Sequence, residues 1–384
     1  MVKDKVTGAL HPFDMKKIYE ALPVLRQLDC NIDTWQFDPI IDSSDMNAGV
    51  WIRLADLIGQ QYDKYDGFVV LHGTDTMSYT ASALSFLLED LSKPVIITGS
   101  QLPLGMIRTD GRENIISAIE IAANEQVAIG EVCIFFENKL FRGNRTTKFN
   151  AEHFEAFYSG NYPSLAKVGI NIIYKQHLLR PLSNKTLKVY NKMCDNVIIV
   201  KVHPALRQEY LEAFLAVEGL KGVVLETYGS GNAPTSPWFI NAIKKAIDKG
   251  VIVLNVTQCK AGSVVMGHYE ASMELLNIGV VSGGDITTEA ALAKLMFVLA
   301  NYNSKEERIR MLNSDMRGEI TGKEVWDYAS TAADMTYDET DKCYKVTIVT
   351  TVEDNGQSKF RFVGNHKQNI NWHEDTKDEA KMKA

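Results

Sequence analysis

The sequence predicts an α/β protein with two domains, each built on a parallel sheet covered by helices. Three observations lead to this class. Short apolar runs are followed repeatedly by longer stretches of helical periodicity, the runs are β-branched and apolar on both faces, and Gly or Pro bounds them. The 384 residues, 45% of them apolar, are also enough for more than one core.

The first domain is predicted over residues 1–195, and its opening is unusual. The chain begins MVKDKVTGALHPFD, a charged segment with Gly and Pro instead of an apolar strand. Strands are then expected at residues 68–71 and 95–98 and in GEVCIFFEN, and helical stretches follow the first two. Because parallel strands need crossover connections, this alternation predicts a larger parallel sheet.

The second domain is predicted over residues 196–321. Its strands are expected in NVIIVKVHP, LKGVVLETYG, GVIVLNVTQ and IGVVSGGD, with helices at residues 237–249 and 288–302. Short, Val- and Ile-rich strands paired with helices again predict a parallel sheet. Residues 322–384 are more polar: KVTIVTT and SKFRFVG around EDNGQ predict a hairpin, and the last segment is predicted to be disordered.

Composition and charge exclude several classes of protein. The net charge is −7 with both signs interspersed, so neither nucleic acid nor an anionic membrane is an expected partner. The five cysteines stand apart without a C-x-x-C pair, which indicates free thiols in a reducing compartment and no zinc site. No signal peptide is recognisable, and no apolar run approaches the roughly 20 residues of a membrane span. We therefore expect a cytoplasmic protein without a metal, whose partners are small molecules or proteins.

Polar residues gather where the expected strands end, which is where ligands bind in open α/β sheets. LHGTDTM places Thr74 and Asp75 between a strand and a helix, where backbone N–H groups can hold an anion; an isolated T-D-T can equally be a helix cap. LFRGNRTTKFN places Arg142, Arg145 and Lys148 in one expected polar loop. Such a loop is ordinarily solvated, but a buried lysine beside a carboxylate can transfer protons.

A third cluster, IIDSSDMN, holds Asp42, Ser43 and Ser44 after a short apolar run. Its hydroxyls could donate to the carboxylate of a zwitterionic ligand while an aspartate accepts from the ligand's ammonium. By composition alone the same segment is a turn or a cap. Both interpretations remain open from the residues alone.

Taken together and in this order, HGTDTM, ITGSQ, RGNRTTK and YGSGNAP resemble the bacterial-type L-asparaginase family, and within it the cytoplasmic type I branch. The resemblance runs from residue 1 to about residue 321. It implies an asparaginase-like fold whose larger domain has a flavodoxin-like sheet, and hydrolysis of L-asparagine to L-aspartate and ammonia through a threonine acyl-enzyme. It also implies no cofactor, and a homodimer or homotetramer in which YGSGNAP contributes to the active site of a neighbouring subunit.

The resemblance implies roles for single residues. Thr74, Lys148 and Asp75 match a catalytic group in which the lysine relays a proton while the aspartate balances its charge and binds the substrate's ammonium. The positions that bind the substrate's α-carboxylate and amino group are matched by Asp42, Ser43 and Ser44. The position that faces the leaving amide is matched by Ser100.

A second, regulatory asparagine site is known in some type I members, and part of it is matched by Thr146, Thr147 and Cys259. However, Glu226 stands where a type I relative has an arginine. Because a negative charge would repel the effector's carboxylate, we expect regulation to be weak or absent.

The start of the chain departs from the family's pattern. The family's first strand and its Thr-Gly-Gly-Thr-Ile segment, which supplies the threonine that attacks the amide, would lie immediately before Met1. Either the start was assigned too late or the chain is a variant without its nucleophile. Since the other site residues are present, we expect the first. As written, the chain is expected to have low asparaginase activity and poor stability.

Two other functions are compatible with the same motifs. One is the ammonia-releasing subunit of a tRNA-dependent amidotransferase, which uses the same kind of domain. The other is a non-catalytic asparagine sensor, in which Ser43, Ser44 and Asp75 bind asparagine without cleaving it.

Overall fold

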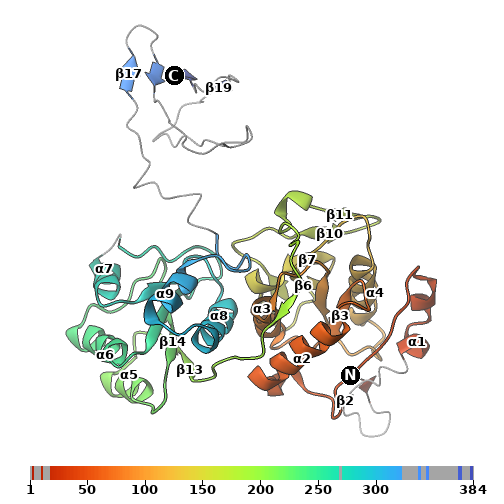
Figure 1. Ribbon diagram of the computed structural model, residues 1–384, viewed down its shortest axis with the longest axis horizontal. Coiled ribbons are helices and arrows are strands. Elements are labelled where there is room, and N and C mark those ends of the chain that lie inside the picture. Colours follow the sequence, from red (N-terminus) through yellow and green to blue (C-terminus); the bar gives the residue numbers. More distant parts are fainter. Residues whose placement is uncertain are drawn as a thin grey trace. The chain divides into compact units, whose positions relative to one another are not determined.

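The computed structural model describes residues 18–267 and 270–321, the paired strands β1 (Val2–Lys3) and β2 (Leu10–His11), and four short strands after residue 321 (Figure 1). The chain divides into two compact units, Met1–Thr321 and Gly322–Ala384. The first unit contains two α/β domains.

The larger sheet has the strand order β11-β10-β7-β6-β5-β3. Its strands are β3 (Phe68–Leu71), β5 (Val95–Thr98), β6 (Val132–Phe136), β7 (Lys139–Arg142), β10 (Ala166–Val168) and β11 (Ile172–Tyr174). β3, β5 and β6 are parallel, in the register that sets Phe68 opposite Val95 and Val95 opposite Val132. The strands expected at 68–71 and 95–98 are therefore confirmed.

This sheet is mixed rather than wholly parallel, because the chain reverses directly after β6. Glu137 and Asn138 connect β6 to β7 with φ angles of 43° and 63°, and the antiparallel pairing begins with Phe136 opposite Lys139. Positive φ at both central residues is what a type I′ hairpin turn requires. A strand therefore occupies the first part of the segment that was expected to be a polar loop.

Helices cover both faces of the larger sheet. α2 (Ala48–Gln61) and α3 (Met77–Leu87) pack in one cluster with Val95 and Ile97, whereas α4 (Gly111–Ala122) packs in another with Ile96. Since alternate residues of a strand point to opposite faces, β5 is buried on both sides, as its apolar run predicts. β3 is the last strand of this sheet among the described residues, and it is only half-buried.

The smaller sheet is parallel, in the order β13-β14-β15-β16. Its strands are β13 (Val197–Lys201), β14 (Gly222–Thr227), β15 (Ile252–Thr257) and β16 (Val281–Ser282). The helices around it are α5 (Gln208–Leu215), α6 (Pro237–Asp248), α7 (Glu270–Asn277), α8 (Thr288–Asn301) and α9 (Lys305–Asn313). The two helices expected in this domain are confirmed as α6 and α8.

One hydrophobic core joins the two domains. α3 of the first domain packs against α8 of the second, with the rings of Phe86 and Phe297 stacked 6.0 Å apart. Every residue of α3 except Tyr79 is buried. A helix that is buried around its whole circumference must pack against other elements on every side. α3 packs against the larger sheet and against α8, and it thereby links the two domains.

Short elements complete the first unit. They are α1 (Ile18–Ala21), η2 (Pro23–Gln27), η3 (Ser43–Asp45), η4 (Gly143–Arg145) and η5 (Gln176–Leu178), with the antiparallel pairs β4 (Leu88–Glu89) and β12 (Lys188–Val189), and β8 (Thr147–Lys148) and β9 (Phe157–Tyr158). Across the described part of the chain, no helix has the length and apolar character needed to cross a membrane.

The second unit contains an antiparallel sheet in the order β17-β18-β20-β19. Its strands are β17 (Thr336–Asp338), β18 (Cys343–Lys345), β19 (Asn371–His373) and β20 (Lys381–Lys383). β19 and β20 fall within the segment that was predicted to be disordered. The hairpin predicted around EDNGQ lies outside the described residues.

Candidate active site

Two segments far apart in the sequence meet beyond the C-terminal end of β3. One is loop 72–76, which leads from β3 to α3, and the other is β8. Lys148 of β8 donates from Nζ to Thr74 Oγ1 at 2.8 Å, and its Nζ lies 2.6 Å from Asp75 Oδ1 in an ion pair. The structure thus brings together the three residues predicted to be catalytic.

The two partners of the ion pair differ in exposure. The side chain of Lys148 keeps 20% of its accessible surface and that of Asp75 keeps 69%. Lys148 is fixed by the pairing of β8 with β9 and by its neighbour Thr147, whose Oγ1 donates to Glu289 Oε1 at the start of α8. A carboxylate that faces solvent beside a fixed ammonium is free to meet a cationic group of a ligand.

Thr74 is held between a donor and an acceptor. Its Oγ1 accepts from Lys148 and donates to Gln101 Oε1 at 3.0 Å. Gln101 donates in turn from Nε2 to the carbonyls of Ala151 and His153, at 3.2 and 3.1 Å. Lys148 Nζ is the amine in contact with Thr74 Oγ1, and an amine in this position can exchange a proton with a threonine hydroxyl. Gln101 was not among the predicted site residues, and its signal was its place in ITGSQ, at the exit of β5.

The acidic loop predicted to bind substrate packs against loop 72–76. Thr76 Oγ1 donates to the carbonyl of Ser43 at 2.6 Å, and Ser43 is buried. A Cβ on Gly73 would lie 2.7 Å from Ser43 Cβ, so only glycine allows the two loops to approach this closely.

Asp42 and Ser44 remain exposed in this loop. Asp42 Oδ1 accepts from the backbone N and from Oγ of Ser44, each at 2.9 Å. These bonds, the one to the backbone N above all, hold the pKa of Asp42 below its usual value. Asp42 is therefore an Asx-type cap of η3 as well as a candidate binding residue.

Ser100 lies at the exit of β5, against the first residue of α4. A Cβ on Gly111 would lie 2.9 Å from Ser100 Cβ. The neighbouring backbone is fixed by Asp110, whose carboxylate accepts from the N of Gln101 and of Leu102, each at 3.0 Å. Asp110 is a positioning residue that the motifs did not single out.

Two of the three cations in RGNRTTK are not solvated, and the expectation of a single polar loop is wrong for them. Arg142 ends β7 and its Nε lies 2.5 Å from Glu131 Oε2, while Arg145 Nη1 lies 2.9 Å from Asp285 Oδ2. The side chains of both arginines are almost completely buried. The β6–β7 reversal brings these cations inside the fold, where each needs a carboxylate partner.

Burial shifts the pKa values of three groups around the site. It lowers the pKa of His72, whose ring lies between the Gly73 carbonyl and Thr80 Oγ1. It raises the pKa of Glu289, although the Thr147 hydrogen bond opposes this effect. Burial, with Glu289 and Glu226 nearby, raises the pKa of Tyr79 to about 12.

Comparisons with known proteins agree with these motifs. The family profile described as "Asparaginase, N-terminal" matches residues 1–180, and the profile "Glutaminase/Asparaginase C-terminal domain" matches residues 196–312. L-asparaginase 1 of Escherichia coli is 43% identical over 286 residues, which cover 74% of this chain and 84% of that protein.

The chain belongs to the asparaginase family.

The solved structure of L-asparaginase I from Vibrio cholerae matches this asparaginase-family chain with a TM-score of 0.76 and 42% sequence identity. The match covers 83% of this chain and 95% of the Vibrio cholerae chain. The 60 kDa lysophospholipase of Mus musculus is 45% identical over 285 residues, which span 74% of this chain and 50% of the mouse protein. A more distant relative, at 32% identity, is a Glutamyl-tRNA(Gln) amidotransferase component from Pyrococcus abyssi. The resemblance to type I asparaginases and the two-domain α/β fold are both confirmed.

The hydroxyls that match the asparaginase regulatory site are used within the fold. Thr146 Oγ1 donates to the carbonyl of Arg142 at 2.7 Å and Thr147 Oγ1 donates to Glu289. Cys259 is exposed, and its backbone N donates to Thr257 Oγ1. Among the described residues no hydrogen bond joins Thr146, Thr147 and Cys259 to one another.

Glu226, which stands in place of an arginine, also has an internal partner. Its Oε1 accepts from Thr288 Oγ1 at 2.7 Å. The asparaginase motif YGSGNAP follows at the exit of β14, where Tyr228 bridges to Asn232 around Gly229 and Gly231, both with positive φ. This turn requires glycine at its positive-φ positions.

Proposed function

We propose that this protein hydrolyses L-asparagine to L-aspartate and ammonia through a threonine acyl-enzyme. The observation that supports the proposal most strongly is the group formed by Thr74, Lys148 and Asp75, with Lys148 Nζ at 2.8 Å from Thr74 Oγ1 and 2.6 Å from Asp75 Oδ1. A hydroxyl, an amine and a carboxylate in this contact can move the proton that amide hydrolysis requires.

The reaction proceeds in two steps. A threonine Oγ bonds to the side-chain carbonyl carbon of asparagine, its proton passes to the base and then to the amide nitrogen, the C–N bond breaks and ammonia leaves. Water then adds to the ester carbon, the bond to the threonine Oγ breaks, and the proton returns to that oxygen. Donors directed at the oxyanion of each step are typically worth about 3–4 kcal/mol apiece.

In the family resemblance the first attack belongs to a threonine of a Thr-Gly-Gly-Thr-Ile segment, which the 384 residues do not contain. Thr74, Lys148 and Asp75 are the second threonine group. A polypeptide without this segment is therefore proposed to release ammonia slowly, and one that carries it is proposed to be faster. Equal activity with and without the segment would refute the role assigned to its threonine.

The substrate is proposed to lie against loop 72–76 and the Asp42–Ser44 loop, which are in contact at Gly73 and Ser43. Asp75, exposed and fixed beside Lys148, takes the α-ammonium, and the Asp42–Ser44 loop binds the α-carboxylate and amino group. The leaving amide lies towards Ser100. We further propose a cytoplasmic homodimer or homotetramer in which YGSGNAP contributes to a neighbouring subunit's site.

Lys148→Met tests the chemistry directly in a polypeptide that carries the Thr-Gly-Gly-Thr-Ile segment. We expect ammonia release from L-asparagine to fall on the order of 10²- to 10⁴-fold, because the proton relay is lost. The matched control is Lys64→Met, which removes a lysine from an exposed pair with Asp33 at 3.8 Å and should leave the rate unchanged. An unaltered rate in Lys148→Met would remove Lys148 from the mechanism.

The two alternative functions have their own tests. Similarity to the Pyrococcus amidotransferase component favours release of ammonia for a partner protein, so ammonia release that requires tRNA-bound glutamate and a second polypeptide would select it. Calorimetry with L-asparagine tests the sensor: tight binding without ammonia release by the polypeptide that carries the Thr-Gly-Gly-Thr-Ile segment would select that function.

A further inference from the structure

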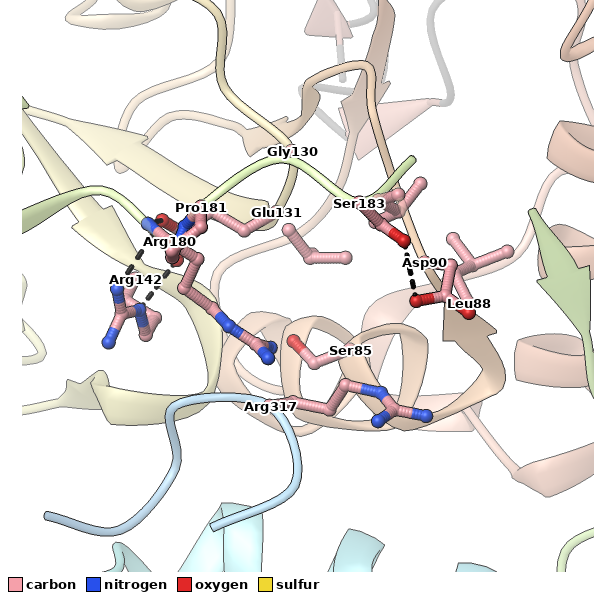
Figure 2. A pocket seen from close by; sticks show the side chains of 12 residues that line it. Ser85, Leu88, Asp90, Gly130, Glu131, Arg142, Arg180, Pro181, Ser183 and Arg317 are labelled. Carbon is pink, nitrogen blue, oxygen red and sulfur yellow. Dashed lines mark hydrogen bonds and ion pairs between the residues drawn. The ribbon is translucent and has the colours of Figure 1, made fainter. Parts of the chain in front are cut away.

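A polar cavity of about 140 Å³ lies between α3, the segment that connects the two domains, and the segment after α9 (Figure 2). Three arginines line it, Arg142, Arg180 and Arg317, and Ser85 of α3 lies between the last two. None of the proposed catalytic residues takes part in its wall. The volume has room for several waters, and therefore for a tetrahedral oxyanion.

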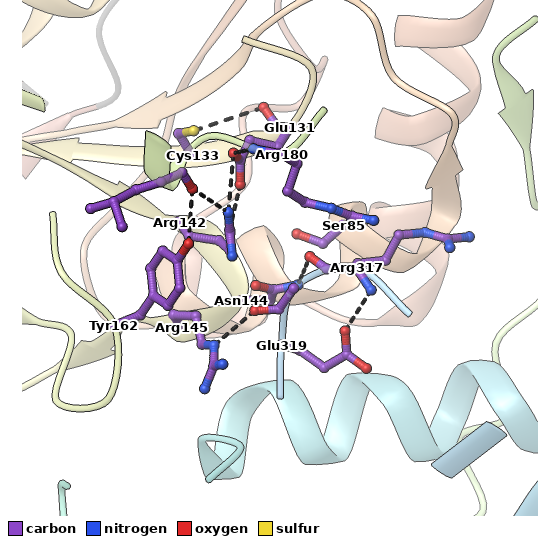
Figure 3. A network of polar contacts seen from close by, with 12 residues as sticks. Ser85, Glu131, Cys133, Arg142, Asn144, Arg145, Tyr162, Arg180, Arg317 and Glu319 are labelled. Carbon is purple, nitrogen blue, oxygen red and sulfur yellow. Dashed lines mark hydrogen bonds and ion pairs between the residues drawn. The ribbon is translucent and has the colours of Figure 1, made fainter. Parts of the chain in front are cut away.

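The charge of Arg142 is already neutralised. Its Nε lies 2.5 Å from Glu131 Oε2, and its Nη2 donates to the carbonyl of Leu178 at 2.9 Å (Figure 3). Glu131 Oε1 also accepts from the backbone N of Arg180 at 3.0 Å. Arg142 and Glu131 therefore form one wall of the cavity and contribute little free charge to it.

Arg180 and Arg317 are less completely paired. Among the described residues, the Arg180 guanidinium has a single hydrogen bond, to the carbonyl of Met316 at 3.4 Å. Arg317 forms an ion pair with Glu89 at 3.0 Å, and its Nη1 donates to the carbonyl of Met316 at 2.9 Å. Within the described part of the chain, its Nε is buried without a hydrogen-bond partner. Burial lowers the pKa of Arg180. The nearby carboxylates of Asp315 and Glu131 oppose this effect, and Arg142 and Arg317 act in the same direction as burial.

An arginine cannot lose its proton in a protein, so a buried guanidinium needs acceptors rather than neutralisation. Unsatisfied buried donors call for an unseen ion or water as partner. Two carboxylates line the cavity, Glu131 and Asp90. Asp90 accepts from Ser183 Oγ at 2.8 Å and would repel an anion placed beside it (Figure 2).

We propose that this cavity is a binding site for a compact oxyanion of the phosphate type, held by the guanidinium groups of Arg180 and Arg317. Planar guanidinium groups match the oxygen spacing of such anions and can bind them with two parallel hydrogen bonds. Because the hydroxyl proton of Ser85 is used on the carbonyl of Ala81 at 2.8 Å, the arginines supply the recognition. This site is independent of the proposed asparaginase activity.

The oxyanion would stabilise the junction of the two domains. The segment that carries Arg317 is bonded to η4, through Asn144 Nδ2 to the carbonyl of Arg317 at 2.9 Å and Arg145 Nε to the carbonyl of Gly318 at 2.7 Å (Figure 3). η4 directly precedes β8. A ligand that bridges Arg180 and Arg317 therefore ties the connecting segment to this assembly, and binding to the folded state alone raises stability.

Calorimetric titration of the full chain with sodium phosphate, against sodium chloride at matched ionic strength, tests the site. We expect saturable binding, a rise in Tm on the order of 3 °C at saturating phosphate, and a similar response to sulfate. Arg180→Gln should weaken binding at least about tenfold, because a charged hydrogen bond is worth more than about 1.4 kcal/mol. The matched control is Arg207→Gln, which changes an arginine that keeps 65% of its side-chain surface.

The outcomes are distinct. Binding that Arg180→Gln weakens and Arg207→Gln does not supports the site. Arg317→Lys keeps the charge but removes the planar donor pair, so it should also weaken phosphate binding, and it serves if Arg180→Gln fails to fold. No saturation by phosphate, or equal binding in the parent and the cavity variants, overturns the proposal, as would saturation by L-aspartate but not by phosphate or sulfate.

Discussion

Two lysine–carboxylate pairs in this molecule have the same length and opposite surroundings. Lys148 and Asp75 are 2.6 Å apart, with 20% and 69% of their side-chain surfaces exposed. Lys294 and Glu319 are also 2.6 Å apart, and both are fully buried. The distance alone therefore does not distinguish a candidate catalytic pair from a structural one.

The difference lies in the other hydrogen bonds of each pair. Lys294 also donates to the carbonyls of Leu312 and Ser314, and Glu319 accepts from backbone N–H groups after α9. These bonds leave no position for a ligand. Asp75, in contrast, keeps most of its surface in water, so it can still bind a ligand. We call Lys294–Glu319 the closed pair, because its hydrogen bonds are all made within the fold, and Lys148–Asp75 the open pair, because its carboxylate can still bind a ligand.

The largest effect is expected from breaking the closed pair. Lys294→Met leaves the charge of Glu319 buried without a partner, which typically costs about 3–5 kcal/mol. Urea unfolding should show this loss. In the double variant Lys294→Met with Glu319→Leu most of it should return, because no buried charge remains. A single variant as stable as the parent would show that Lys294 does not stabilise the fold.

The same pair should control stability in acid. Burial alone would raise the pKa of Glu319, but Lys294 and the backbone N–H groups of Met316 and Arg317 outweigh burial and lower it to about 2 from the usual 4.5. The charged carboxylate therefore stabilises the fold fully above pH 4.5, and this stabilisation is lost as the pH falls towards 2.

Urea midpoints measured between about pH 5 and about pH 2.5 would check this prediction. The parent should lose stability more steeply than the Lys294→Met, Glu319→Leu double variant across this window, because the double variant lacks the group that titrates. Equal slopes would contradict the assignment to Glu319.

A smaller effect is expected from disturbing the loop that carries the open pair. Gly73→Ala places a Cβ against Ser43, an overpacking that typically costs about 1–3 kcal/mol. Loop 72–76 should shift and displace Thr74 and Asp75. The rate of ammonia release should therefore fall further than the loss in the free energy of unfolding alone would explain. The matched control is Gly169→Ala, where the nearest atom to a Cβ is 3.9 Å away. Gly73→Ala with the parent's activity and stability would show that the loops can separate freely.

The smallest stability effect is expected from breaking the open pair itself. Lys148→Met removes a partly exposed ion pair, which is typically worth about 1 kcal/mol or less. Urea unfolding should therefore move little, although the rate of ammonia release falls greatly. A loss of stability as large as that of Lys294→Met would erase the distinction between the two pairs.

The outcome at RGNRTTK shows how far the sequence could predict the site. Its motif, with HGTDTM, predicted that Lys148 meets Thr74 and Asp75, and these contacts are present. The same motif gave no indication that Arg142 and Arg145 are buried. Their partners, Glu131 and Asp285, lie on other elements and share no pattern with them.

The sequence by itself determined the fold class and the order of the motifs, because apolar periodicity and turn residues act over a few positions and are repeated along the chain. Only the tertiary structure decided which cation of RGNRTTK stays partly exposed and which are enclosed. It also decided that Lys294 and Glu319 meet inside the core and that Gly73 lies against Ser43. Burial and charge pairing depend on the path of the whole chain, since the partners of a side chain come from segments that its own neighbours in sequence do not specify.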